Sequence, residues 1–194
     1  MLENKYKIVL ASGSPRRREL LAGLDIDFEV RVLPDVDESY PEGLTGVEIA
    51  QAISRKKADA YRKTLQDKEL IITADTIVYM RGEVIGKPTD EEEARNMLRK
   101  LSGRVHQVVT GVTLLSKDFE RSFVSVSNVT FSKLTNNEIE YYINNYHPLD
   151  KAGAYGIQEW IGFVGVERIE GSYFNVMGLP IQRLYQELKK IEEM

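Results

Sequence analysis

The segment from Lys7 to Arg18 constrains this chain more than any other stretch. Its apolar run, Ile8–Leu10, has the composition of a buried strand and ends at the sequence Ser-Gly-Ser-Pro. Ser14 can cap the N-terminus of a helix, and Pro15 fits the first helical position. The arginines at 16 to 18 then lie in the first turn, where the helix dipole disfavours positive charge. The segment predicts a strand, a tight loop and a helix that begins with a cluster of cations.

Such a cluster has the chemistry of an anion site. Backbone N–H groups, the hydroxyls of Ser12 and Ser14, and guanidinium groups converge at the C-terminal end of the predicted strand. These groups bind phosphate. The alternative is that the arginines are solvated and the loop is an ordinary connection. Neither a P-loop nor a Gly-x-Gly-x-x-Gly sequence is present. We favour a phosphate site because the serines, proline and arginines occur together.

Bulk properties exclude several classes of protein. The chain has 194 residues, which suits one domain, and its formal net charge of −4 gives no support for DNA binding as the main activity. Cysteine is absent, so disulfides and thiolate metal sites are excluded. The sequence has neither a signal-peptide pattern nor an apolar run long enough for a membrane span. We therefore expect a cytoplasmic protein that has no membrane partner.

Strand-like and helix-like segments alternate without a repeat or an obvious linker. We predict strands near 6–11, 28–33, 70–80, 83–85, 105–115, 119–134 and 161–169, and helices near 15–22, 47–65, 89–101, 135–146 and from 180 onward. Thr135 and Glu138 have the spacing of a capping box at the start of one helix. The pattern predicts an α/β protein with a long mixed sheet.

Two acidic residues are candidates for chemistry. Asp75 lies inside an apolar, β-rich run, where a carboxylate needs a cation, hydrogen bonds or a metal. The alternative for Asp75 is a structural role, bonded to nearby backbone groups. Glu38 belongs to an acidic loop, and such loops are often merely solvated. Together the two could bind Mg²⁺, which needs only one or two protein carboxylates when substrate phosphates complete its shell.

Three further polar residues lie in informative positions. Lys87 stands between a glycine and a proline, which fix the backbone and could aim its ammonium into a cleft. Lys57 is on a predicted helix, where most lysines are exposed. Gln158 ends a segment rich in small residues and offers the donor and acceptor that the imide edge of a base requires. The alternative for that segment is a tight structural loop with Tyr155 in the core.

Other catalytic constellations are missing from the sequence. His106 and His147 lie far apart and lack the spacing of zinc ligands. No Gly-x-Ser-x-Gly sequence supports a serine nucleophile.

Taken in order, the motifs resemble the Maf family of nucleoside triphosphate pyrophosphatases. They are Ala11-Ser12-Gly13-Ser14-Pro15-Arg16-Arg17, Ala74-Asp75-Thr76, Gly86-Lys87-Pro88, Thr110-Gly111-Val112, Lys151-Ala152-Gly153-Ala154-Tyr155-Gly156-Ile157-Gln158 and Asn175-Val176-Met177-Gly178-Leu179-Pro180. The resemblance runs from about Ile8 into the C-terminal helix.

The resemblance implies a fold, an activity and a set of roles. The fold is one α/β domain over residues 1–194, with an elongated bent mixed sheet and two lobes around a cleft, related to the inosine triphosphate pyrophosphatases. The activity is metal-dependent hydrolysis of a nucleoside triphosphate to its monophosphate and pyrophosphate, commonly by a homodimer. Asp75 matches the proton acceptor, and Glu38 is expected to help it hold Mg²⁺ or Mn²⁺. Ser12, Arg17, Lys57 and Lys87 match positions at the phosphates.

The resemblance also implies a substrate class. The branch acting on dTTP and UTP has arginine, threonine and glutamine where this chain has Arg16, Thr76 and Gln158. The branch acting on 7-methyl-GTP has an aromatic residue, glutamine and glutamate there. We expect a dTTP/UTP pyrophosphatase that cleanses the nucleotide pool. The alternatives are a 7-methyl-GTP pyrophosphatase and a nucleotide-binding regulator of septum formation.

Overall fold

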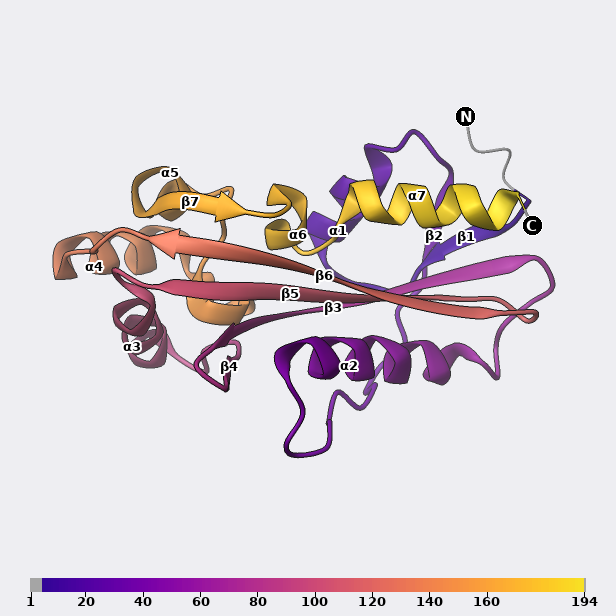
Figure 1. The fold of residues 1–194 in the computed structure, drawn as a ribbon, viewed down its shortest axis with the longest axis horizontal. Helices are drawn as coiled ribbons and strands as arrows, with labels where there is room; N and C mark the ends of the chain where they lie inside the picture. Colours follow the sequence, from indigo (N-terminus) through magenta and orange to yellow (C-terminus); the bar gives the residue numbers. More distant parts are fainter. Residues whose placement is uncertain (1–4, 194) are drawn as a thin grey trace.

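The computed structural model describes residues 5–193 as strands and helices around one sheet (Figure 1). The strands are β1 (Lys7–Leu10), β2 (Phe28–Val30), β3 (Glu69–Met80), β4 (Glu83–Ile85), β5 (Val105–Leu115), β6 (Glu120–Phe131) and β7 (Val166–Glu170). The α-helices are α1 (Pro15–Ala22), α2 (Gly46–Tyr61), α3 (Glu91–Leu101), α4 (Asn136–Tyr146), α5 (Trp160–Gly165), α6 (Tyr173–Met177) and α7 (Ile181–Glu192), with 3-10 turns η1 (Pro148–Asp150) and η2 (Ala152–Ala154).

The sheet is mixed, as the sequence predicts. Its strand order is β2-β1-β3-β5-β6-β7, and β4 pairs with β3. The β2-β1-β3 neighbours are parallel, whereas β3-β5-β6-β7 and β3-β4 are antiparallel. The long strands β3, β5 and β6 run along most of the molecule (Figure 1). None of the helices within residues 5–193 has the length and apolar character that crossing a bilayer requires.

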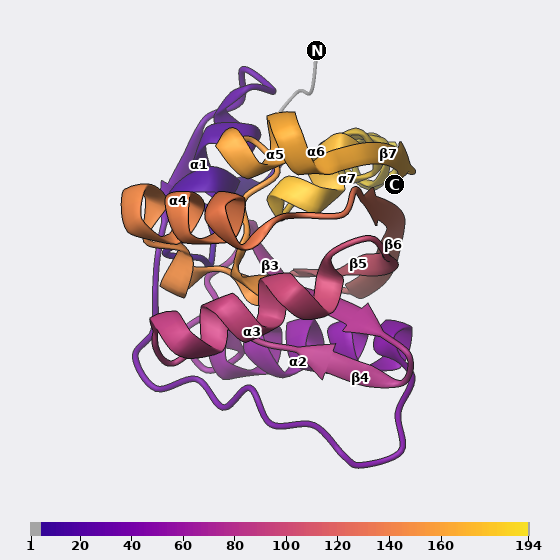
Figure 2. The ribbon, with the colours of Figure 1, turned by 90° about the vertical axis from the view of Figure 1, so that its left-hand side faces the viewer.

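Helices cover both faces of the sheet, and β3 divides its residues between them. Even-numbered residues such as Ile72 pack in one cluster with α1 and α7, whereas odd-numbered residues such as Ile71 pack against α2. This follows from the alternation of side chains along a strand. Figure 2 shows α2 on the opposite side of the sheet from α1 and α7. Asp75 and Thr76 therefore point to opposite faces at the same place in the sheet.

The hydrophobic core is divided along the length of the long strands. One cluster joins β1, β3 and β5 to α1 and α7, with Leu10, Leu21 and Leu184 fully buried. Another joins the far ends of β3, β5 and β6 to α3, α4 and α5, with Leu98 and Ile161 fully buried. The same three strands thus connect both clusters, and a site midway along them is supported from both ends.

Most predicted boundaries are confirmed, because their signals are local. Ser14 caps α1 by accepting a hydrogen bond from the backbone N–H of Arg17, and Pro15 begins the helix. Thr135 and Glu138 form the predicted capping box of α4. Pro180 directly precedes α7. The helix predicted over 47–65 ends earlier, at Tyr61.

The strand predicted over 161–169 is wrong in its first half. Residues Trp160–Gly165 form α5, and only Val166–Glu170 form β7. A short apolar run does not distinguish a strand from a buried helical turn. Here the turn buries Ile161 completely and brings Gly165 against Leu134. It also needs a glycine at 162, since a Cβ there would lie 1.8 Å from the carbonyl oxygen of Ile157.

His106 gives the fold a measurable dependence on pH. It is buried on β5, with Nε2 at 2.7 Å from the Tyr155 hydroxyl. Burial lowers its pKa from 6.5 to about 4, so the folded chain holds it neutral where the unfolded chain takes up a proton. We expect the contribution of His106 to the free energy of unfolding to fall as the pH drops from 6.5 to 4, by up to about 3 kcal/mol.

Urea unfolding of the wild type and of His106→Gln at several pH values measures this contribution. Glutamine keeps a hydrogen-bonding group beside Tyr155 but does not titrate. The difference in unfolding free energy between the two proteins should change with pH between 6.5 and 4. The slope should correspond to nearly one more proton bound by the unfolded than by the folded wild type. A difference that stays constant from pH 7 to pH 4 would contradict the assignment.

Candidate active site

The candidate site lies on an open stretch of the edge of β3. β1 pairs with β3 as far as Ile72, and β4 pairs from Val78 onward. Within residues 5–193, the intervening stretch 73–77 therefore has a strand neighbour only on the β5 side. A cavity of about 440 Å³ opens beside this stretch, large enough for a small-molecule ligand.

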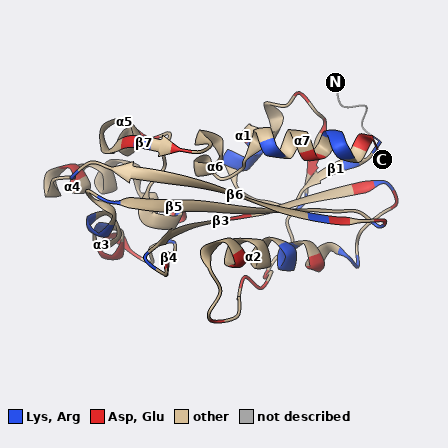
Figure 3. Cartoon of the chain, in the orientation of Figure 1, with Lys and Arg blue, Asp and Glu red and all other residues tan. Residues whose placement is uncertain are grey.

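The cavity gathers residues from distant parts of the chain. The predicted site residues that line it are Ser12, Arg16, Arg17, Glu38, Lys57, Thr76, Lys87 and Gln158. Asp75 lies directly behind this lining, because its Oδ1 is 2.6 Å from Nζ of Lys57, which lines the cavity. Figure 3 shows charged residues of both signs spread along the chain, with a group of cations at the start of α1.

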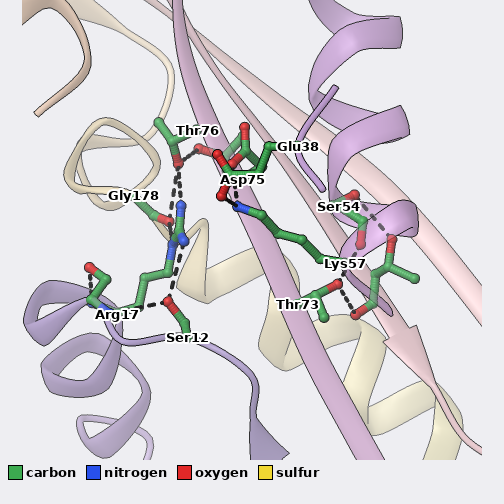
Figure 4. A network of polar contacts seen from close by, with 12 residues as sticks. Ser12, Arg17, Glu38, Ser54, Lys57, Thr73, Asp75, Thr76 and Gly178 are labelled. Carbon is green, nitrogen blue, oxygen red and sulfur yellow. Dashed lines mark hydrogen bonds and ion pairs between the residues drawn. The ribbon is translucent and has the colours of Figure 1, made fainter. Parts of the chain in front are cut away.

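Lys57 joins the two candidate acids (Figure 4). Its Nζ lies 2.6 Å from Oδ1 of Asp75 and 2.8 Å from Oε1 of Glu38. The Asp75 and Lys57 side chains are only 13% and 14% exposed, so this is a largely desolvated ion pair. Asp75 thus has the cation that a carboxylate inside a strand requires. Lys57 can reach Asp75 because the odd-numbered residues of β3 face α2, the helix that carries Lys57.

The charge of Glu38 reflects the cations around it. Its partial burial alone would raise the pKa of the carboxyl. The hydrogen bond from Lys57, together with the positive charges of Lys57, Lys87 and Arg17, outweighs burial and lowers the pKa below its usual range. Glu38 is therefore ionised at neutral pH.

Arg17 clamps three segments at the other side of the cavity (Figure 4). Its Nε donates to the carbonyl oxygen of Gly178 at 2.8 Å, and Nη2 donates to Thr76 Oγ1 at 3.1 Å. Nη1 reaches Ser12 Oγ at 3.4 Å. Burial lowers the pKa of Arg17 and the charge of Asp75 opposes this, but a guanidinium stays protonated in proteins. A fixed positive charge therefore stands at the meeting point of β1, β3 and the turn after α6.

Lys87 and Arg16 are two further cations that line the cavity. Lys87 follows β4 and is exposed, and its ammonium makes no hydrogen bond or ion pair with any residue that the structure describes. Arg16 donates from Nη1 to Oδ2 of Asp150 at 3.1 Å. Lys87 is thus available to a ligand, whereas Arg16 is already paired.

Gln158 presents an unsatisfied acceptor. Its Oε1 is buried and has no hydrogen-bond partner among residues 5–193. Gln158 also lines the cavity. A buried carbonyl oxygen without a partner carries a desolvation cost of about 1–3 kcal/mol, which a ligand donor can remove. The N–H of a uracil or thymine imide is such a donor.

The acids suit a divalent metal held jointly with a ligand. Among the described residues, no group of three or more His, Cys, Asp or Glu side chains has the arrangement of a metal site. Asp75 and Glu38 nevertheless share one cation, the ammonium of Lys57. Two carboxylates fit Mg²⁺ or Mn²⁺ when phosphate oxygens complete the coordination.

Some residues of the site belong to or adjoin the quoted motifs but were given no role from the sequence. Thr110 Oγ1 lies 2.9 Å from Thr76 Oγ1, and the carbonyl oxygen of Gly178 accepts from Arg17. Asp150 and the buried Lys151 also line the cavity. Lys151 begins the small-residue motif of the family and Asp150 directly precedes it, but a charged pair is by itself too common to indicate a site.

Comparison with known proteins gives one consistent family. The family model described as Maf-like protein matches residues 7–191. A Phocaeicola vulgatus protein named dTTP/UTP pyrophosphatase is 61% identical over 193 residues, covering 98% of this chain and 100% of the relative. A Bacteroides thetaiotaomicron protein with the same name is 59% identical over 188 residues, covering 97% of each.

Comparison with solved structures shows a similar fold. The structure of a HAM1 protein from Coxiella burnetii matches with a TM-score of 0.50 at 17% identity, covering 95% of this chain and 99% of that one.

Proposed function

Because this chain belongs to the family of Maf-like proteins, we propose that it hydrolyses dTTP and UTP to the monophosphate and pyrophosphate. The observation that carries the proposal is the arrangement of charges around the cavity. Arg17 lies on one side and Lys57 with its two carboxylates on the other, and the exposed Lys87 also lines the cavity. A polyphosphate chain is the ligand class that such cations accept.

The cations divide the work of holding the triphosphate. Lys87 is exposed and free to bind a phosphate oxygen, whereas Arg17 is fixed by its hydrogen bonds to Gly178 and Thr76. Arg17 still has N–H groups to offer, because a guanidinium carries five and three are used. Backbone N–H groups at the start of α1 add to the same anion site.

Asp75 is the base in this proposal. Its carboxylate orients a water molecule and accepts its proton as the water attacks phosphorus. The P–O bond between the α- and β-phosphates breaks in the same step, and pyrophosphate leaves. Lys57 holds Asp75 at 2.6 Å and fixes the direction of the carboxylate. Positioning and fixed charge supply most of the rate enhancement in phosphoryl transfer, and this arrangement provides both.

Glu38 and Asp75 would hold Mg²⁺ or Mn²⁺ together with the substrate phosphates. When bound, the metal neutralises negative charge on the phosphates. Lys57 lies between the same two carboxylates, and the third N–H of its ammonium remains for a phosphate oxygen.

Three residues determine which nucleobase the site accepts. Gln158 offers the buried Oε1 as acceptor for an imide N–H. Arg16 lines the same cavity. The Thr76 hydroxyl is engaged with Arg17 and Thr110, so Thr76 acts on the substrate through the position of Arg17.

The cellular setting of this activity is also a proposal. The enzyme works in the cytoplasm as a homodimer and cleanses the nucleotide pool. The relatives are named dTTP/UTP pyrophosphatase, which supports the hydrolytic activity that cleansing of the nucleotide pool requires.

Pyrophosphate release across a panel of nucleotides tests the proposed function. The panel contains dTTP, UTP, dATP, dGTP and 7-methyl-GTP, each with Mg²⁺ and with excess EDTA. We expect dTTP and UTP to have kcat/KM values at least about tenfold above the purines, because one buried hydrogen bond changes selectivity by that factor. EDTA should reduce release to background.

Each other outcome of the panel has a meaning. Faster turnover of 7-methyl-GTP would place the chain in the other substrate class. Tight binding of dTTP without pyrophosphate release would favour a nucleotide-responsive regulator of septum formation. Full activity in EDTA would remove the metal from the proposal.

A further inference from the structure

A chain of ion pairs runs beside the cavity, separate from the phosphate cations. Arg16 donates to Oδ2 of Asp150 at 3.1 Å, and Lys151 Nζ contacts Oδ1 of the same carboxylate at 2.7 Å. Lys151 Nζ also lies 3.1 Å from Oε1 of Glu159. Both oxygens of Asp150 are thus occupied, and Asp150 links a residue of α1 to the segment between η1 and α5.

This chain is anchored in the core at its far end. The Lys151 side chain is only 9% exposed, which is rare for a lysine unless it is paired. The fully buried Tyr142 of α4 donates its hydroxyl proton to Oε2 of Glu159 and accepts a hydrogen bond from the Gly156 N–H at 3.0 Å. Burial and the neighbouring Glu159 raise the pKa of Tyr142, so this hydroxyl keeps its proton.

The residues at the two ends of this series of ion pairs indicate what it does. Arg16 stands at one end. Gln158, at the other, lies between Gly156 and Glu159, and both of those residues are held by Tyr142. Ion pairs of this kind are weak evidence for stability, because solvent screens the exposed Asp150 and desolvation of the buried Lys151 offsets its attraction to the carboxylates. What it does provide is a fixed spacing between two residues that belong to different elements.

We propose that Asp150, Lys151 and Glu159 are positioning residues that hold Arg16 and Gln158 at the spacing of a pyrimidine base. The inference rests on the proposed function for the role of Arg16 and Gln158. The three residues touch no reacting atom. They select the substrate by restraining the two groups that contact the base.

Removing one charged residue from this series of ion pairs would release its neighbours. Without Asp150, the Arg16 guanidinium loses its only ion-pair partner among the described residues and regains rotamer freedom. Without Lys151, the Asp150 and Glu159 carboxylates lose the ammonium that holds them together. Asp150 is the better residue to test, because its side chain is 59% exposed and its removal leaves no buried charge at that position.

The experiment measures KM, kcat and binding for the wild type and for Asp150→Ala. Binding uses the non-hydrolysable α,β-imido analogues of dTTP and dGTP, so it reports on base selection even if turnover is absent. We expect Asp150→Ala to raise KM for dTTP about tenfold with kcat within about threefold, and to lower the preference for dTTP over dGTP about tenfold. Asp150→Glu should restore part of both effects.

A matched control separates positioning from general destabilisation. Glu140 of α4 also pairs with an arginine, Arg95 of α3, away from the cavity. Glu140→Ala should leave KM and base preference unchanged. Asp150→Ala with unchanged base preference, or with a loss confined to kcat, would overturn the inference. Wild-type protein that binds dTTP selectively but releases no pyrophosphate would instead refute the proposed function and leave the binding comparison decisive.

Discussion

Asp75→Asn is expected to lower kcat for dTTP by about a thousandfold or more, with the fold intact. General-base catalysis contributes about 10²- to 10⁴-fold, and an amide does not accept a proton from water at neutral pH. Asparagine has nearly the shape of aspartate, and its oxygen can still accept the hydrogen bond from Lys57. The strand around Asp75 is paired with β5 on one side and stays so in the variant.

Binding should survive this substitution, and that separates it from simple damage to the site. Lys57 keeps Glu38 as an ion-pair partner, and the site loses one negative charge beside the phosphates. The amide oxygen of asparagine would still be a metal ligand beside Glu38, so KM for dTTP should change by less than about threefold. Steady-state kinetics, circular dichroism and thermal unfolding measure these effects. Asp67→Asn, at an exposed ion pair with Lys117, is the control and should keep full activity. Turnover retained in Asp75→Asn would remove Asp75 as the base.

Gly111→Ala is expected to destabilise the protein by about 3 kcal/mol or more, at the upper end of overpacking effects. Gly111 lies on β5 directly opposite Asp75 of β3. A Cβ at this position would lie 2.1 Å from the carbonyl oxygen of Ala50 and 2.4 Å from its carbonyl carbon. These are backbone atoms of α2, so the whole helix must move. Because α2 carries Lys57, the ion pair with Asp75 should weaken as well.

Urea unfolding and kcat/KM together test this effect. Gly86→Ala is the control, since a Cβ there meets nothing within 4 Å, and its unfolding free energy should stay within about 0.5 kcal/mol of the wild type. A Gly111→Ala variant as stable as the wild type would show that α2 and β5 do not pack as closely as described.

Much of the fold could be predicted because its signals are local. The Ser14 cap, the Thr135 capping box and the turn before β4 are each written in a few adjacent residues. The segment 161–169 lacked such a signal, since its apolar run suits a strand and a helical turn equally. Its conformation depends on two contacts. Gly165 lies against Leu134, which is distant in sequence, and Gly162 lies close to Ile157 only once the helical turn has formed.

Less of the candidate site than of the fold could be predicted from the residues alone. The types of Asp75 and Lys57 suggested chemistry, but their contact depends on which face of β3 the aspartate takes and where α2 crosses it. The acceptor for Arg17 is a backbone carbonyl, at Gly178, which no residue type encodes. The ordered set of motifs, read as a family resemblance, carried the assignment of roles further than any single pattern did.

The most direct test is a crystal structure of Asp75→Asn bound to dTTP and Mg²⁺. We predict the triphosphate between Arg17 and Lys57 with Lys87 over it, and the thymine ring against Gln158. A nucleotide bound elsewhere on the molecule, with these cations turned to bulk solvent, would contradict the proposed function.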